Sequence, residues 1–208
     1  MAAPAANRVA LPRLGQAGLV ARPDIWLCRH GETEWSRVGR HTSRTDLPLT
    51  PPGLEEARRL ASRLSDVTFD LVLTSPLRRA ADTAALAGFA DAIREPAASE
   101  WDYGEYEGWT TADIRKEVPG WTVWTDASPG GETAEQVGAR ADRIIDRVLR
   151  EAPTRALLFS HAHFLRVLAA RWIDLPATSG VRLLLDTGSV SLLGWEREVQ
   201  AIKHWNTE

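Results

Sequence analysis

The sequence is poor in several kinds of residue, and each shortage excludes a class of protein. A single cysteine, Cys28, among 208 residues excludes an internal disulfide framework and is typical of a reducing compartment. No apolar run approaches the ~20 residues that a membrane-spanning helix needs. Lys116 and Lys203 are the only lysines, and the net charge of −3 offers no basic surface for nucleic acid. We therefore expect a cytoplasmic protein with neither a membrane nor a nucleic-acid partner.

Residues 1–23 show no periodic pattern. Alanine, proline and glycine alternate there without the continuous apolar core of a secretory signal, so we expect a flexible N-terminal extension. Residues 24–208 contain neither an internal repeat nor a linker. Their length suits one domain with a sizeable core, which we expect at 24–208.

Short apolar runs alternate with amphipathic stretches along the rest of the chain. Strands are expected at 25–28, 69–75, 91–96 and 155–160, with two or three more between 181 and 205. Helices are expected at 49–64, 76–88, 111–118, 132–152 and 163–173; Thr50 and the pair Thr133 and Gln136 provide N-terminal caps. The alternation predicts an α/β fold: a three-layer α/β/α sandwich around a mostly parallel sheet with an antiparallel edge.

Polar residues follow three of these strands directly, at the sheet edge where α/β proteins bind ligands. In chain order they are Arg29, His30, Ser75, Arg78 or Arg79, and His161. Imidazoles together with guanidinium groups predict a pocket for an oxyanion, and phosphate is the commonest biological oxyanion.

The stretch CRHGETEWS at 28–36 holds two candidate nucleophiles, Cys28 and His30. A cysteine phosphatase loop needs an arginine six positions after its cysteine, and this chain has Glu34 there. Cys28 is therefore interpreted as a small apolar residue at a strand end. The imidazole of His30 can carry a phosphoryl group when it is neutral, and neighbouring guanidinium groups lower the pKa of such a ring.

Phosphoryl transfer from an ester also needs a carboxyl group that protonates the leaving alkoxide. The loop SEWDYGEYEGW offers four, and spacing does not choose among Glu100, Asp102, Glu105 and Glu107. His161 and His163 lack the cysteine or HExxH partners of a metal site, so we expect no metal and no cofactor. His41 and His204 are interpreted as surface residues.

Four segments, RHGETEW, TSPLRRAADTA, EWDYGEYEG and SHAHFLR, resemble in order and spacing the signature segments of the histidine phosphatase superfamily. Within that superfamily the segments are similar to those of the phosphoglycerate-mutase-like branch. Within this branch they are similar to those of the acid and sugar phosphatases. The resemblance runs from about Ile25 to the C-terminus. It implies a phosphoglycerate-mutase-like fold and a metal-independent phosphomonoesterase that acts on a small phosphorylated metabolite through a phosphohistidine. Homodimerisation is a further family-level expectation.

Carried over by position, the resemblance makes His30 the nucleophile and Arg29 the phosphate-binding residue beside it. It makes Arg79, rather than Arg78, the second phosphate-binding arginine. His161 then donates to a phosphate oxygen, and Glu100 is the proton donor. The positions on the substrate side are Ser36, Thr42, Ser43, Tyr103 and Ala162.

Three departures from the mutase pattern favour a phosphatase. Ser36 replaces an asparagine, EWDYG lacks an arginine, and the segment 103–131 is short and acidic. Two alternatives stay open: a phosphoglycerate mutase, and a non-catalytic phosphate-binding module on the same fold. The substrate and the roles of Arg40, Arg44 and Glu132 are also open, since the place of Glu132 before a helix already has an explanation in the helix dipole.

Overall fold

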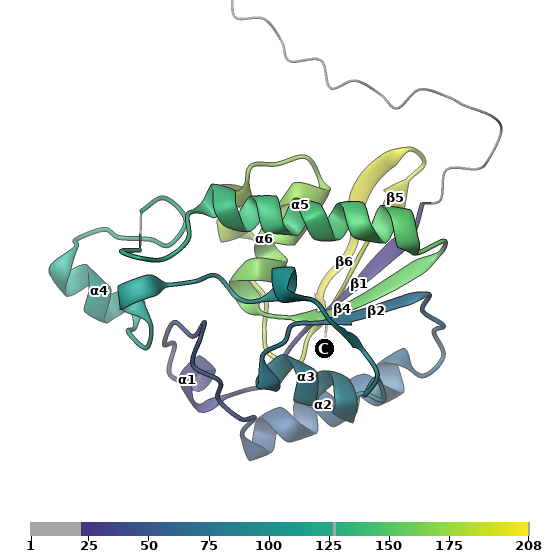
Figure 1. Cartoon of the computed structure of the whole chain (residues 1–208), viewed down its shortest axis with the longest axis horizontal. Coiled ribbons are helices and arrows are strands. Elements are labelled where there is room, and N and C mark those ends of the chain that lie inside the picture. Colours follow the sequence, from purple (N-terminus) through teal and green to yellow (C-terminus); the bar gives the residue numbers. More distant parts are fainter. Residues whose placement is uncertain (1–21, 127, 208) are drawn as a thin grey trace, which may run out of the picture.

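Six strands form one mixed sheet at the centre of the computed structural model, which describes residues 22–126 and 128–207 (Figure 1). In sheet order they are β3 (Ile93–Arg94), β2 (Leu71–Thr74), β4 (Arg155–Ser160), β1 (Asp24–Arg29), β5 (Val190–Glu196) and β6 (Val199–Thr207). The first four strands run parallel, whereas β5 pairs with both β1 and β6 in the antiparallel sense. The expected parallel sheet with an antiparallel edge is confirmed, and the two or three strands expected between 181 and 205 are two, β5 and β6, the second of which continues to Thr207.

Helices cover both faces of the sheet and confirm the three-layer sandwich (Figure 1). Helices α2 (Pro51–Leu64) and α3 (Arg78–Leu86) lie on one face, and α5 (Ala134–Glu151) and α6 (Ala162–Trp172) on the other. The connections contain α1 (Glu34–Arg37), α4 (Thr111–Glu117) and three short 3-10 helices, η1 (Pro96–Ala98), η2 (Gly104–Tyr106) and η3 (Ala177–Arg182).

The strands divide their side chains between two apolar cores, as the period of two in a strand requires. In β4, Leu157 and Phe159 pack in the core that includes Leu60 of α2. Leu158 points the other way, into the core that includes Val137 of α5. Burial on both faces explains why these strands are almost wholly apolar.

The predicted helix starts are confirmed in detail. The Thr133 hydroxyl accepts a hydrogen bond from the Gln136 amide, and the Gln136 side chain accepts one from the Thr133 amide at 2.8 Å. The Thr50 hydroxyl accepts from the Gly53 amide at 3.2 Å, with prolines filling the first helical positions of α2. Both caps satisfy amide groups that have no partner within the helix.

Most of the expected N-terminal extension, 1–21, lies outside the described residues. Its last two residues contact the antiparallel edge: Arg22 donates to the Arg197 carbonyl at 2.8 Å, and the Pro23 carbonyl accepts from Trp195 Nε1 at 3.1 Å. Within the described part of the chain, no helix is both long enough and apolar enough to span a membrane.

Candidate active site

The carboxyl ends of β1, β2 and β4 bring the predicted polar residues to one place. The His30 amide donates to the Ser160 carbonyl at 3.0 Å, and the Ser75 amide donates to the Phe159 carbonyl at 2.9 Å, so the chain stays attached to the sheet where each strand ends. The rings of His30 and His161 consequently meet edge to face, with centroids 5.1 Å apart.

His30 is buried, and its protonation follows from one contact. Nδ1 lies 2.7 Å from the Gly31 carbonyl oxygen, which can only accept, so Nδ1 carries the ring proton and Nε2 keeps its lone pair. Burial, and then the charges of Arg79 and Arg29, lower the pKa of His30 well below its ordinary value. The ring is therefore neutral, with one nitrogen available as a nucleophile.

The loop after His30 lies directly on the first turn of α2. A β-carbon on Gly31 would collide with the Gly53 carbonyl, and one on Gly53 would collide with the backbone of Glu32. The Gly31 amide also donates to Thr83 of α3 at 3.1 Å. Both glycines are needed for this backbone approach, which fixes the position of the imidazole.

A cavity of about 380 Å³ opens beside His30. Seven of the ten predicted site residues line it: Arg29, His30, Ser36, Thr42, Glu100, Tyr103 and Ala162. The other three, Ser43, Arg79 and His161, are buried next to it and do not line its wall.

Arg29 lines this cavity and has a guanidinium nitrogen without a partner among the described residues. One terminal nitrogen donates to the Leu185 carbonyl at 2.5 Å, while Nε is buried and has no hydrogen-bond partner among residues 22–126 and 128–207. A buried donor without a partner is costly unless a ligand satisfies it. The guanidinium is therefore suited to an anion in the cavity.

Arg79 and His161 form a connected pair behind the cavity wall. Arg79 Nε donates to Nδ1 of His161 at 3.1 Å, and its terminal nitrogens donate to the Thr45 and Thr42 carbonyls at 3.2 and 3.0 Å. His161 Nε2 lies 2.7 Å from the Ser75 hydroxyl. Donation from His161 to a bound phosphate therefore requires Nε2 to exchange the serine for the phosphate.

Of the four candidate carboxyl groups, Glu100 is the one that lines the cavity. One carboxylate oxygen accepts from the Trp101 and Phe164 amides, each at 2.9 Å, and the other accepts from the His163 amide at 3.2 Å. His163 and Phe164 begin α6, so the carboxyl group faces a helix N-terminus. Burial raises the pKa of Glu100 above its ordinary value against the opposing effect of these amides.

The other three carboxyl groups serve elsewhere. Glu107 accepts from the Ser43 and Thr45 amides and the Ser43 hydroxyl, which fixes the loop beside Arg79. Asp102 pairs with Arg44, and Glu105 is exposed. Of these four carboxyl groups, Glu100 is therefore the one that lies at the cavity.

The side chains of His41, Tyr103 and His163 form a cluster in another part of the cavity wall. The Tyr103 hydroxyl lies 2.6 Å from Nδ1 of His163, and the His41 ring packs 4.6 Å from the ring of Tyr103. The interpretation of His41 as a surface residue is wrong, because it is only 8% exposed, and burial lowers its pKa to about 4. His204 is exposed, as expected.

Sequence reasoning missed most of the outer wall of the cavity. This wall comes from the residues on either side of α1, from α4 and from the loop after α4, which together contribute Thr33, Gly39, Arg40, Thr111, Arg115, Thr122, Val123 and Trp124. No strand ends there, so the rule that located the inner residues does not reach it. The four tryptophans between 101 and 124 pointed to this region, either as lining for the substrate or as cover for the core, and Trp124 is the one of them that lines the cavity.

Within residues 22–126 and 128–207, no three or more His, Cys, Asp and Glu side chains gather in a way that could hold a metal ion. His161 and His163, two positions apart in the sequence, bond instead to Ser75 and Tyr103.

Cys28 lies away from this chemistry. Its side chain is fully buried in the core under α2 and α3, and burial raises the pKa of the thiol to about 12. A thiol that stays protonated is a poor nucleophile, in agreement with its interpretation as a packing residue.

The fold and the cavity together define an α/β protein equipped for phosphoryl chemistry at the carboxyl edge of its sheet. The model of the histidine phosphatase superfamily (branch 1) matches residues 25–208, and the chain belongs to that superfamily.

Individual relatives agree with the family assignment. The chain is 42% identical to an acid phosphatase of Mycobacterium tuberculosis over 181 residues, which cover 86% of this chain and 89% of the relative. It is 34% identical to a sedoheptulose 1,7-bisphosphatase of Saccharomyces cerevisiae, over 74% of this chain and 68% of the relative. A solved structure from Mycobacterium tuberculosis superposes with a TM-score of 0.84 at 39% identity, over 88% of this chain and 97% of the other. The chain is thus a phosphatase of the histidine phosphatase superfamily.

Proposed function

We propose that the chain hydrolyses phosphomonoesters of small metabolites through a phosphohistidine at His30. The observation that carries the proposal is the hydrogen bond from Nδ1 of His30 to the Gly31 carbonyl, which leaves Nε2 unprotonated at the cavity wall. Nε2 attacks phosphorus in line, and a nitrogen–phosphorus bond forms as the ester oxygen–phosphorus bond breaks. The leaving alkoxide takes its proton from Glu100. Glu100 then deprotonates a water that attacks the phosphohistidine, which releases inorganic phosphate and restores His30.

In this proposal Arg29, Arg79 and His161 bind the transferring oxygens. The buried, unpartnered Nε of Arg29 supports its share of this role. For Arg79 and His161 the support is their position against His30, since the charge of Arg79 lowers the pKa of both imidazoles. Guanidinium groups fixed before the reaction stabilise the charge that develops on the phosphoryl oxygens.

We further propose that the substrate's leaving group occupies the outer part of the cavity, beside Ser36, Thr42, Tyr103 and Ala162. Ser43 contributes through the loop that Glu107 holds. A volume of about 380 Å³ exceeds the needs of a phosphate group and supports a small organic phosphate. Homodimerisation and a cytoplasmic location stay predictions.

Hydrolysis is favoured over the two alternatives on separate grounds. The relatives at 42% and 34% identity are both named as phosphatases, which supports hydrolysis over mutase activity. The lowered pKa of His30 and the raised pKa of Glu100 are the directions that a nucleophile and an acid require. These shifts support catalysis over phosphate binding alone.

The test is hydrolysis of p-nitrophenyl phosphate by the wild type, His30→Ala and the control His204→Ala, which changes an exposed histidine of β6. We expect His204→Ala to match the wild type and His30→Ala to lose activity by about 10³-fold or more. Rapid quenching of the wild type should trap an acid-labile phosphoenzyme that His30→Ala lacks. Activity retained in His30→Ala overturns the proposal, and transfer of phosphate between the hydroxyls of a phosphoglycerate without hydrolysis favours the mutase.

A further inference from the structure

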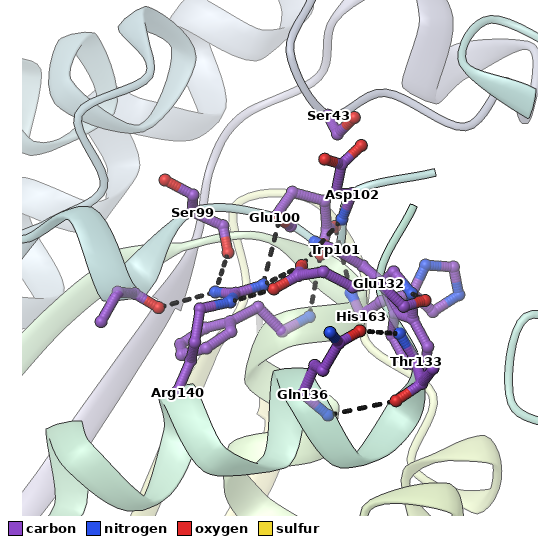
Figure 2. A network of polar contacts seen from close by, with 12 residues as sticks. Ser43, Ser99, Glu100, Trp101, Asp102, Glu132, Thr133, Gln136, Arg140 and His163 are labelled. Atoms are coloured by element: carbon purple, nitrogen blue, oxygen red, sulfur yellow. Dashed lines mark hydrogen bonds and ion pairs between the residues drawn. The ribbon is translucent and has the colours of Figure 1, made fainter. Parts of the chain in front are cut away.

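An ion pair outside the cavity connects α5 with the loop that carries Glu100. Arg140 of α5 donates from Nε and a terminal nitrogen to the two carboxylate oxygens of Glu132, each at 2.7 Å. The side chains are 13% and 22% exposed, respectively. Figure 2 shows the guanidinium reaching from the helix into the loop. Such a bidentate geometry, largely shielded from water, is rigid and specific.

The rest of this guanidinium holds the backbone up to Glu100. One terminal nitrogen of Arg140 donates to the Ala97 and Ser99 carbonyls at 2.7 and 2.8 Å, and the other donates to the Glu100 carbonyl at 3.3 Å (Figure 2). Three carbonyl groups between residues 97 and 100 are thereby bound by one side chain.

Glu132 holds the backbone that follows Glu100. Its carboxylate accepts from the Asp102 amide at 3.0 Å, its amide donates to the Asp102 carbonyl at 2.9 Å, and its carbonyl accepts from Trp101 Nε1 at 2.9 Å (Figure 2). The ion pair thus grips the chain on both sides of Glu100. A carboxylate that only interacted with the helix dipole at the N-terminus of α5 would need none of these contacts. The helix dipole alone therefore does not explain the arrangement of Glu132.

Arg140 also touches the other partner of the Glu100 carboxyl group. Its guanidinium carbon lies 5.0 Å from the centre of the Phe164 ring, and the Phe164 amide is one of the donors to that carboxyl group. The same cation therefore contacts both the loop that carries the acid and the helix turn that orients it.

The backbone of Glu100 needs this support because the residue itself lies in neither a helix nor a strand. The residue lies between η1 and η2, and it also borders a second cavity of about 290 Å³. Glu132 and Arg140 line that second cavity but not the first. Empty space behind the loop leaves room for it to shift once the ion pair is broken.

We propose that Glu132 and Arg140 are positioning residues that hold the proton donor Glu100 at the leaving-group oxygen. The proposal rests on the proposed function, because it assigns to the pair the placement of the acid in that reaction. Neither residue contacts the substrate.

The experiment compares two substrates that differ in their need for an acid. The leaving group of glycerol 2-phosphate is an alkoxide that must be protonated, whereas p-nitrophenolate leaves readily without a proton. The quantity measured is kcat/KM, which reports the step that forms the phosphoenzyme and not its hydrolysis. The variants are Arg140→Gln, Arg140→Lys and Glu132→Gln.

Arg147 provides the matched control, since it lies on the same helix and pairs with Glu95 at 2.6 Å, with side chains 25% and 17% exposed. Glu95 precedes η1, so this pair holds the same segment without reaching Glu100. Arg147→Gln therefore reproduces the loss of a partly buried ion pair and its cost in stability.

We expect Arg140→Gln and Glu132→Gln to lower kcat/KM for glycerol 2-phosphate about tenfold or more beyond any loss with p-nitrophenyl phosphate. Arg140→Lys keeps the positive charge but loses the planar guanidinium that binds both carboxylate oxygens. Its kcat/KM for glycerol 2-phosphate should therefore lie between those of the wild type and Arg140→Gln. Inhibition by inorganic phosphate should stay as in the wild type in these variants. In Arg147→Gln the ratio of kcat/KM between the two substrates should also stay as in the wild type. Equal losses on both substrates, or the same change of ratio in Arg147→Gln, overturn the inference. Inactivity of the wild type on both substrates instead overturns the proposed function.

Discussion

Arg79 Nε donates to Nδ1 of His161 across 3.1 Å, and this contact decides how the second imidazole is protonated. Because Nδ1 accepts, the proton of the neutral ring lies on Nε2 and points toward the Ser75 hydroxyl. The same guanidinium holds the Thr42 and Thr45 carbonyls. One side chain therefore sets both the tautomer of His161 and the position of a loop at the cavity.

Replacement of Arg79 by lysine should cost about 10²-fold in kcat/KM for p-nitrophenyl phosphate, because a single ammonium cannot serve three acceptors in a fixed plane. Arg78→Lys is the control. Arg78 is the adjacent residue of α3, is exposed, and pairs with Asp82 at 3.0 Å. For the Arg78→Lys variant, kcat/KM for p-nitrophenyl phosphate should stay within about twofold of the wild type. Similar losses in the two variants would show that the planar contacts of Arg79 are unimportant.

Cys28→Ala should keep full activity although Cys28 is two residues from His30. The thiol is fully buried and its pKa is raised to about 12, so it takes no part as a thiolate. Loss of its packing should lower the free energy of unfolding by about 1 kcal/mol. Urea denaturation measures the stability, and p-nitrophenyl phosphate hydrolysis measures the activity. A folded Cys28→Ala protein without activity contradicts this account.

The pH dependence of kcat/KM for glycerol 2-phosphate should have a falling limb on its alkaline side. Burial raises the pKa of Glu100, so the acid form that donates the proton persists above the ordinary carboxyl range and is lost as the pH rises through the raised pKa. The lowered pKa of His30 keeps the nucleophile neutral into the acid range. Glu100→Gln should be slower and lack the falling limb. A limb that survives in Glu100→Gln belongs to another group.

Stability should decrease on acidification because of His41. Burial lowers its pKa from 6.5 to about 4, so between these values the unfolded chain binds a proton that the folded chain does not. This difference costs up to about 3 kcal/mol as the pH falls from 6.5 to 4. His41→Gln, compared with the wild type by thermal unfolding over this range, should show a shallower loss of Tm. An unchanged slope would assign the effect to the other buried histidines.

Local patterns were sufficient to predict the fold. The caps at Thr50 and Thr133 act within a few residues, and the apolar strands report burial on both faces. The residues after β1, β2 and β4 were found by the same logic, because the carboxyl ends of parallel strands share one edge. The caps, the apolar strands and the polar residues after them can all be recognised from residues that lie close together in the sequence.

What the sequence did not predict depends on contacts between distant segments. Arg140, for example, reaches the Glu100 carbonyl across 40 positions. The burial of His41 likewise arises from the rings of Tyr103, in the loop before η2, and His163, in α6. Such pairs leave no periodic pattern in the sequence, because their two residues come together only in the folded structure.

The bond between His30 and the Gly31 carbonyl has a consequence for the chemical identity of the intermediate. With Nδ1 protonated, Nε2 is the one ring nitrogen that can form the bond to phosphorus. The proposed phosphoenzyme should therefore be a single regioisomer, the τ-phosphohistidine, and no π-phosphohistidine should form. Phosphorus NMR of the denatured phosphoenzyme, with the two isomers of phosphorylated histidine as standards, distinguishes them. A main-chain oxygen, which substitution cannot remove, thus acts as the regiochemical control of the reaction.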